Sequence, residues 1–175
     1  MRDAADSVED RWIGIQEAPL AVDEVAAWVA TPSCGAVSTF VGIIRDHSEG
    51  REGVTHIDYE TYSEYAERRL NEVADIAFST WPDVGRIAIV HRIGRVPVGE
   101  SAVVCSVSAS HRREAIAAMT FSIDVLKKCA PIWKTEFAGV ARAWPDNGST
   151  ILATAEAASA WFAENSGLMP HPVTS

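Results

Sequence analysis

The sequence predicts an α+β fold with a mainly antiparallel sheet and flanking helices. Segments of alternating small and β-branched residues come in adjacent pairs, and segments with a helical period separate these pairs. Strands that follow one another without an intervening helix favour antiparallel pairing. The chain has 175 residues, 47% of them hydrophobic, which is enough for one domain with its own core.

Four segments have the features of helices. The first ends at Pro32, the second is apolar on one face and ends before Pro82, and the third stops before Pro131. The fourth is rich in alanine and lies near the end of the chain. The expected helices span residues 20–32, 62–81, 111–129 and 154–164.

Five segments have the features of strands. In the first, Gly35 and Gly42 indicate a bend or a close approach of another chain segment. A polar, glycine-bearing loop over residues 47–53 precedes the second, and "PVGE" joins the third to the fourth. The expected strands span residues 34–46, 54–62, 85–96, 100–110 and 132–137.

The two ends of the chain differ from the rest. The start, "MRDAADSVEDRW", and the last ten residues, "SGLMPHPVTS", have the composition of loose ends. We therefore expect an N-terminal extension over 1–12, one domain over 13–147, and a C-terminal helix with a tail over 148–175.

Composition excludes several classes of function. The net charge of −9 disfavours binding to nucleic acid or to an anionic membrane, because both need a broad basic surface. The charged start lacks the apolar core of a secretory signal, and the three cysteines are widely spaced, without a CxxC pair. This pattern argues against zinc and disulfides, so we expect a cytoplasmic protein without a metal or other cofactor.

A local basic segment stands out from this acidic background. "LKKCAPIWKTE" lies within residues 111–136, where five basic residues stand against three acidic ones, a net charge of +2. Such a segment suggests a small anionic ligand. The alternative is an ordinary solvated helix face.

Helical geometry distinguishes the two adjacent lysines of this segment. Lys127 lies at the edge of the expected apolar stripe, and Lys128 lies far around the helix. We therefore expect Lys127 to be partly desolvated and able to act as an acid/base or nucleophile, and Lys128 to be solvated. The expected stripe consists of Ile116, Met119, Ile123, Leu126 and Ala130.

Other residues could complete an anion site. Lys134 follows Pro131 and Trp133, which can hold it rigidly. His111 and Arg112 lie at a strand-to-helix junction, and Arg45 ends a strand. We expect Arg45, His111, Arg112, Lys127 and Lys134 to converge on one site. His91 is interpreted as a structural residue of its strand.

Cys129 leaves two readings open. Beside two lysines it could be a thiolate with a lowered pKa. Its apolar neighbours favour a buried, unreactive thiol instead.

Several stretches together resemble one known family, the large catalytic subunits of molybdopterin synthase (the MoaE family). They are "GAVSTFVGIIRDHSEG", "IDYETYSEYAERRL", "VHRIGRVPVGE", "SASHRREAI" and "LKKCAPIWKTE", in the family's order and covering roughly residues 33–145. The resemblance implies an α/β hammerhead-type fold and a homodimer within a 2:2 heterotetramer. In that assembly a small ubiquitin-like sulfur carrier donates sulfur from its C-terminal glycine thiocarboxylate to cyclic pyranopterin monophosphate, forming the dithiolene of molybdopterin.

The resemblance also implies roles for individual residues. Lys127 and Lys134 match the family's active-site lysines. The residues that match its substrate-binding positions are Ile43, Ile44, Arg45, His111, Arg112, Thr135 and Glu136. Two rival readings remain: a cysteine-based sulfurtransferase that uses Cys129, and a relative that binds the carrier without catalysis.

Overall fold

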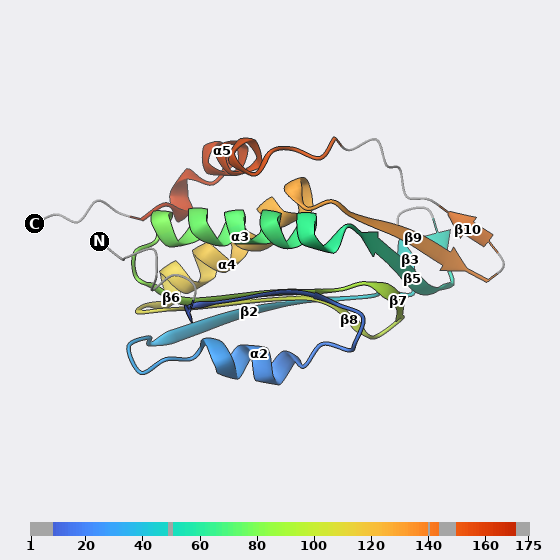
Figure 1. Ribbon diagram of the computed structural model, residues 1–175, viewed down its shortest axis with the longest axis horizontal. Coiled ribbons are helices and arrows are strands. Elements are labelled where there is room, and N and C mark those ends of the chain that lie inside the picture. Colours follow the sequence, from blue (N-terminus) through green and yellow to red (C-terminus); the bar gives the residue numbers. More distant parts are fainter. Residues whose placement is uncertain (1–8, 49–50, 140, 144–149, 171–175) are drawn as a thin grey trace, which may run out of the picture.

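The computed structural model describes residues 9–48, 51–139, 141–143 and 150–170 (Figure 1). Its main sheet has the strand order β1-β6-β8-β2, and its second sheet has the order β10-β9-β5-β7. The strands of the main sheet are β1 (Arg11–Gln16), β6 (Val84–Arg92), β8 (Ser101–Ala109) and β2 (Ala36–Ile43). The strands of the second sheet are β10 (Ala141–Ala143), β9 (Ile132–Ala138), β5 (Val54–Thr61) and β7 (Gly94–Pro97).

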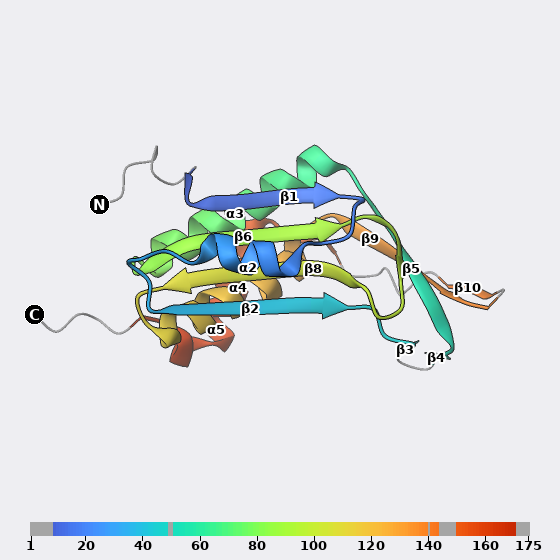
Figure 2. The same ribbon diagram turned by 90° about the horizontal axis from the view of Figure 1, so that it is seen from below.

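Helices cover both faces of the main sheet. Helix α2 (Val22–Val29) packs on one face, and helices α3 (Ser63–Thr80) and α4 (Arg112–Cys129) pack on the other (Figures 1 and 2). Helix α5 (Thr154–Glu164) lies outside α3 and α4, and a 3₁₀ turn over Ser166–Leu168 follows it. The mixed architecture and the dominance of antiparallel pairs confirm the predicted fold class.

Successive side chains of the strands point alternately into two apolar cores, as expected for a sheet that is covered on both faces. Ile87 and Ile89 of β6 belong to the larger core under α3 and α4. Ala88 and Val90 of the same strand face α2. The next residue on the α4 side of β6 is His91, which lies beyond the last buried isoleucine.

One strand of the main sheet, β1, was not predicted from the sequence. Strand β1 pairs in parallel with β6, with Ile13 opposite Ile89. It begins at Arg11, so two residues of the expected N-terminal extension belong to the main sheet. The strand is short and only partly buried, which leaves little contrast between its two faces.

The expected strand over 85–96 is two strands. Gly94 has φ of +72°, a left-handed conformation that turns the chain out of the main sheet after β6 and into the second sheet as β7. The expected loop over 47–53 also contains a short hairpin, formed by β3 (His47–Ser48) and β4 (Arg51–Glu52).

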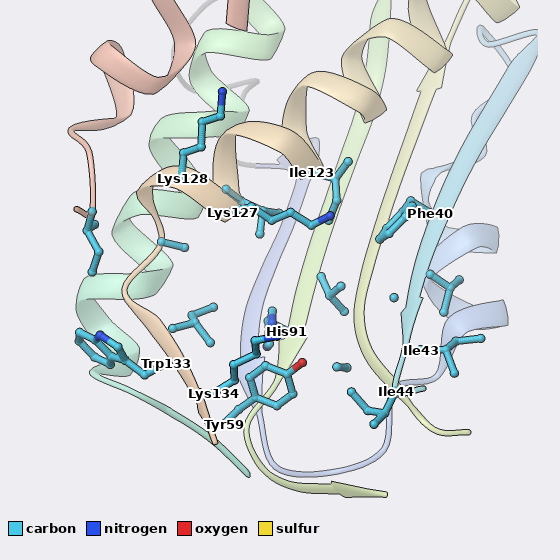
Figure 3. Close-up of a pocket in the computed structure, with 18 of the residues that line it drawn as sticks. Phe40, Ile43, Ile44, Tyr59, His91, Ile123, Lys127, Lys128, Trp133 and Lys134 are labelled. Atoms are coloured by element: carbon cyan, nitrogen blue, oxygen red, sulfur yellow. The ribbon is translucent and has the colours of Figure 1, made fainter. Parts of the chain in front are cut away.

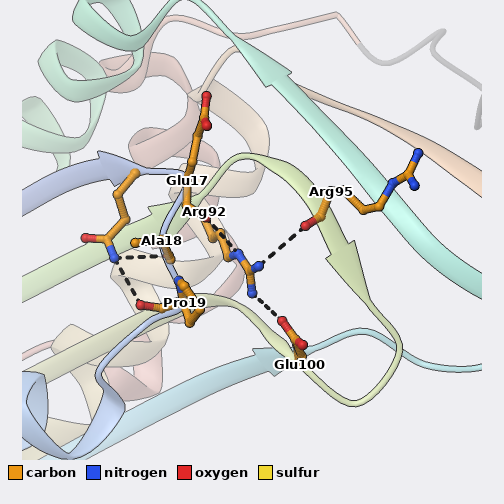
Figure 4. Close-up of polar contacts among 7 residues, drawn as sticks. Glu17, Ala18, Pro19, Arg92, Arg95 and Glu100 are labelled. Atoms are coloured by element: carbon orange, nitrogen blue, oxygen red, sulfur yellow. Dashed lines mark hydrogen bonds and ion pairs between the residues drawn. The ribbon is translucent and has the colours of Figure 1, made fainter.

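A buried arginine secures this turn between the sheets. The guanidinium of Arg92 donates to the backbone carbonyls of Glu17 and Arg95 and forms an ion pair with Glu100 at 2.5 Å (Figure 4). Because Arg92 joins segments from three places in the chain, it fixes the backbone at the end of β6.

Aromatic packing holds α5 against the core. The Trp161 ring lies 5.2 Å from that of Phe121 on α4, and its Nε1 donates to Asp124 Oδ2 at 3.1 Å. The chain preceding α5 joins the end of α4 through a hydrogen bond from the Leu152 amide to the Lys128 carbonyl. The C-terminal segment is therefore part of the same domain.

Candidate active site

A pocket of about 960 Å³ opens where α4 ends and the two sheets meet (Figure 3). Its floor is a row across the main sheet, in which Val103 of β8 pairs with Gly42 of β2 and with His91 of β6. At Gly42 a Cβ atom would lie 2.6 Å from a methyl group of Val103, so the absence of a side chain at this position avoids a clash in the floor of the pocket. The second sheet forms one wall through β5 and β9.

Lys127 extends from the last turn of α4 into this pocket. Figure 3 shows its side chain directed toward Phe40 and Ile123, and its Nζ lies 5.5 Å from the centre of the Phe40 ring. This distance is typical of a cation–π contact, which holds the amine over the apolar end of the pocket.

Lys128 borders the same pocket but extends in another direction. Its side chain points away from Lys127 (Figure 3), and its Nζ lies 3.8 Å from Oε2 of Glu164 on α5. The two adjacent lysines therefore differ in environment, as the sequence predicts.

The predicted burial of these lysines was wrong. Lys127 is the more exposed residue, and Lys128 is half-buried beside α5. The predicted stripe is displaced as well, because Ile116 is 48% exposed. Ala115, Ala117, Ala118, Phe121 and Ser122 are buried in that part of the helix instead, whereas Ile123 and Leu126 are buried as expected.

Lys134 lines the pocket from the opposite side, on β9. Its Nζ lies 3.1 Å from Oε1 of Glu136, whose other oxygen accepts a hydrogen bond from the Ser48 hydroxyl at 2.7 Å. Glu136 is only 7% exposed. The buried carboxylate thus orients the lysine toward the pocket, because the two side chains share one face of the strand.

The chain after β2 supplies three more of the expected residues. Ile43, Ile44 and Arg45 all line the pocket. Ile44 is buried, whereas Ile43 and Arg45 are exposed at the rim. Arg45, Lys127 and Lys134 therefore converge, as predicted, although they come from three separate elements.

His111 and Arg112 do not join them within one chain. They lie at the N-terminal end of α4, about 17 Å along the helix from Ile123, the first α4 residue that lines the pocket. Both side chains are exposed. The expected convergence of all five residues was therefore wrong for a single chain, because a continuous helix separates the two groups.

Thr135 points out of the pocket. It alternates with Lys134 and Glu136 along β9, is buried, and does not line the cavity. Its side chain therefore serves the packing of the strand, and only its backbone borders Lys134, which lines the pocket.

The thiol of Cys129 is unreactive in this environment. Burial raises its pKa to about 11, and the residue is fully buried. It does not line the pocket. The geometry supports the reading of a buried structural cysteine over that of a sulfur-carrying thiolate.

Other residues that the sequence did not predict also line the pocket. Tyr59 and His91 line the pocket, although His91 was interpreted as purely structural. Segment 150–152 forms part of another wall. The strand pattern of "IDYETY" could have placed Tyr59 opposite Lys134, but only the structure shows which face carries the pocket.

No cluster of three or more metal-ligating side chains occurs in the part of the chain that the structure describes. Every helix among the described residues is too short or too polar to cross a lipid bilayer.

Comparisons with known proteins agree on one family. A family model described as "MoaE protein" matches residues 15–129. The molybdopterin synthase catalytic subunit of Taeniopygia guttata is 36% identical over 156 residues, which cover 89% of this chain and 99% of that protein.

Solved structures share the fold. Molybdopterin synthase from Staphylococcus aureus matches with a TM-score of 0.73 and 30% identity, over 77% of this chain and 97% of that one. A Helicobacter pylori chain, solved in a complex of subunits 1 and 2 of molybdopterin-converting factor, has the same fold at a TM-score of 0.59 and 21% identity, over 80% of this chain and 91% of that one. The chain belongs to the MoaE family, the family of the molybdopterin synthase catalytic subunits.

Proposed function

We propose that this chain is the catalytic subunit of a molybdopterin synthase. It transfers sulfur from the C-terminal thiocarboxylate of a small sulfur-carrier subunit to cyclic pyranopterin monophosphate, in the biosynthesis of the molybdenum cofactor. The observation that carries the proposal is the pocket shared by Lys127, Lys134 and Arg45 in a chain of this family.

The charges of the pocket fit this reaction. The substrate carries a phosphate and the carrier tail carries a thiocarboxylate, so two anions must approach each other. Three cationic side chains reduce their repulsion and stabilise the negative charge that develops during transfer. The net charge of the whole chain is −9, so the cations are concentrated where they are needed.

The two lysines have different roles in this proposal. Lys134, held by Glu136 at 3.1 Å, orients the thiocarboxylate. Lys127 is held by the Phe40 ring and acts as the acid/base or as a transient covalent partner. In each transfer the sulfur forms a bond to a substrate carbon, from which an oxygen substituent leaves, and water cleaves the bond between the sulfur and the carrier, so that the carrier tail becomes a carboxylate. No cysteine carries sulfur, and no metal or cofactor takes part.

The substrate-binding roles of His111 and Arg112 require a second copy of the chain. These side chains are exposed at the far end of α4, about 17 Å along the helix from Ile123, the first α4 residue that lines the pocket of their own chain. We place them in the pocket of the partner protomer, in a homodimer that binds two carriers in a 2:2 assembly. Ile116, exposed one turn from Arg112, supplies apolar surface on the same part of α4.

The cysteines support a cytoplasmic location. All three are free thiols, as is usual in a reducing cytoplasm. We place the reaction there.

The direct test mixes the purified protein with thiocarboxylated carrier and cyclic pyranopterin monophosphate and measures molybdopterin by mass spectrometry. A carrier with an ordinary C-terminal carboxylate is the control. Conversion that depends on the thiocarboxylate is expected. Binding of the carrier without any conversion would support the rival reading, a relative that has lost catalysis.

Mixing two inactive variants tests the shared site. The double variants His111→Ala/Arg112→Ala and Lys127→Ala/Lys134→Ala should each be inactive alone. After mixing and exchange of protomers, half of the dimers are mixed and each holds one intact site, so about a quarter of the activity should return. No recovery, or a monomer in light scattering at tens of micromolar, contradicts the dimeric site.

A further inference from the structure

Two uncharged polar side chains lie together in the pocket, apart from its lysines. Tyr59 comes from β5 and His91 from β6, and both line the cavity. Their ring centres are 5.0 Å apart, with an interplanar angle of 75°. Figure 3 shows the Tyr59 hydroxyl directed toward the interior of the pocket, beside the His91 ring. Neither side chain has a role in the sulfur transfer described above.

The structure determines which nitrogen of His91 carries the proton. Nδ1 lies 2.7 Å from the backbone carbonyl oxygen of Arg92. A carbonyl oxygen can only accept, so Nδ1 must be the donor, and in the neutral ring Nε2 is then left with a lone pair. Nε2 forms no hydrogen bond with any described residue.

The position of this histidine is rigid. The carbonyl that accepts from Nδ1 belongs to Arg92, whose guanidinium is tied to Glu17, Arg95 and Glu100 (Figure 4). A side chain anchored to such a fixed backbone keeps its ring plane and tautomer. Its free nitrogen is therefore preorganised for a ligand.

Both side chains are uncharged at neutral pH. Burial lowers the pKa of His91 to about 4. Burial, with a smaller contribution from the charge of Glu136, raises the pKa of Tyr59 to about 12. The pair thus offers one neutral acceptor, Nε2, and one neutral donor, the tyrosine hydroxyl.

We propose that Tyr59 and His91 bind the heterocyclic ring of the substrate, at an edge where an N–H stands beside a carbonyl. The Tyr59 hydroxyl donates to the carbonyl, and Nε2 of His91 accepts from the N–H. This assignment rests on the proposed function, since the pyrimidinone ring of a pterin has such an edge. The charged residues Arg45, Lys127 and Lys134 are then left for the phosphate and the thiocarboxylate.

In this assignment the charged residues bind the anions, and Tyr59 and His91 bind the ring, so these two side chains need to be neutral. An imidazolium or a phenolate would add charge next to Lys134, which lies directly opposite Tyr59 in the β5–β9 pairing. A neutral donor and acceptor instead select for shape and hydrogen-bonding pattern, because a ligand without the matching edge leaves both groups unpaired in a buried site.

Three variants separate these contacts from folding. His91→Asn retains a side-chain donor near the position of Nδ1 for the Arg92 carbonyl and removes the acceptor at Nε2. His91→Gln places an amide oxygen near the position of Nε2 and restores an acceptor. Tyr59→Phe keeps the ring and removes only the hydroxyl. Near-ultraviolet circular dichroism verifies that each variant is folded.

The experiment is an NMR titration of each variant with cyclic pyranopterin monophosphate and, separately, with inorganic phosphate. His91→Asn and Tyr59→Phe should each weaken pyranopterin binding about 3- to 10-fold and leave phosphate binding within about twofold of wild type. His91→Gln should bind the pyranopterin within about threefold of wild type.

Three results would overturn the assignment. These are wild-type affinity in both His91→Asn and Tyr59→Phe, an equal loss for inorganic phosphate, and a loss in His91→Gln as large as that in His91→Asn. Sulfur transfer is measured in parallel with thiocarboxylated carrier. If the variants bind the pyranopterin as expected but the wild type transfers no sulfur, the proposed function is overturned and the ring contacts stand. If the wild type binds no pyranopterin, both are overturned.

Discussion

The amine of Lys134 lies 3.1 Å from the carboxylate of Glu136, two residues further along the same strand. Glu136 is buried and also accepts from Ser48, so the carboxylate is fixed before any substrate arrives. Because the carboxylate is fixed, it also fixes the position of the Lys134 amine, whereas a lysine on a surface strand would lack such a partner.

Glu136→Gln should therefore reduce sulfur transfer by about 10-fold, since it replaces a charge-assisted hydrogen bond with a neutral one. The measurement is single-turnover conversion of the pyranopterin with saturating carrier. Glu64→Gln, at an exposed position in the first turn of α3, is the matched control and should retain full activity.

A double-mutant cycle tests whether Glu136 acts through Lys134. Once Lys134→Ala is present, adding Glu136→Gln should cause little further loss, because the positioned group is gone. Fully additive losses would show that the carboxylate has a separate role.

Lys127→Ala should lower sulfur transfer by about 100-fold or more, because it removes a group that acts mainly in the transition state. Lys128→Ala removes only a partly exposed ion pair with Glu164, at 3.8 Å, and should have little effect on the rate. Both variants should fold, since neither side chain fills the core. Equal activities in the single-turnover assay would contradict the assignment of Lys127.

Cys129→Ala should transfer sulfur at a rate within about twofold of wild type. The thiol is buried, lies outside the pocket, and has a pKa raised by burial to about 11. The substitution should lower the free energy of unfolding by about 1 kcal/mol, measured by urea denaturation, because it leaves a small cavity. Loss of transfer in a folded variant would establish the cysteine-based mechanism.

Acid should destabilise the protein in part through His91. Its pKa is lowered by burial from 6.5 to about 4 in the folded state. Below pH 6.5 the unfolded chain therefore binds a proton that the folded chain excludes, so stability falls between pH 6.5 and 4 and changes no further below that. The shift corresponds to roughly 3 kcal/mol.

Urea denaturation at several pH values between 7 and 4 measures this decline. The His91 ring contacts the Tyr59 ring and the backbone carbonyl of Arg92, and the cations Arg45, Lys127, Lys128 and Lys134 line the same pocket. His91→Asn should show a shallower decline than wild type. Parallel curves would mean that other groups cause the acid sensitivity.

Much of the fold could be predicted because its patterns are local. Proline marks the ends of the longer helices, and the alternation of β2, β8 and β9 is visible in the sequence. The points at which one strand ends and the next begins were harder to locate. Gly94 splits one apparent strand through its left-handed backbone, and nothing in the alternation of neighbouring residues distinguishes that glycine from one that merely packs closely.

The site was predictable in part for the same reason. The lysines of α4 and β9 belong to one short basic segment, so their convergence follows from local geometry. His91 looks like an ordinary strand residue, because its role depends on which face of the sheet lies beyond the end of α4. The partial burial of Lys128 depends on how α5 packs, because its amine lies 3.8 Å from Glu164 of that helix, and no local pattern encodes this packing.

The wall formed by segment 150–152 determines when the site can exist. The amide of Leu152 binds the carbonyl of Lys128, and β1 near the start of the chain pairs with β6, which carries His91. During synthesis the pocket therefore stays incomplete until the ribosome has translated beyond residue 152 and that segment has emerged. A nascent chain that stalls after β9 carries both lysines without the wall that encloses them.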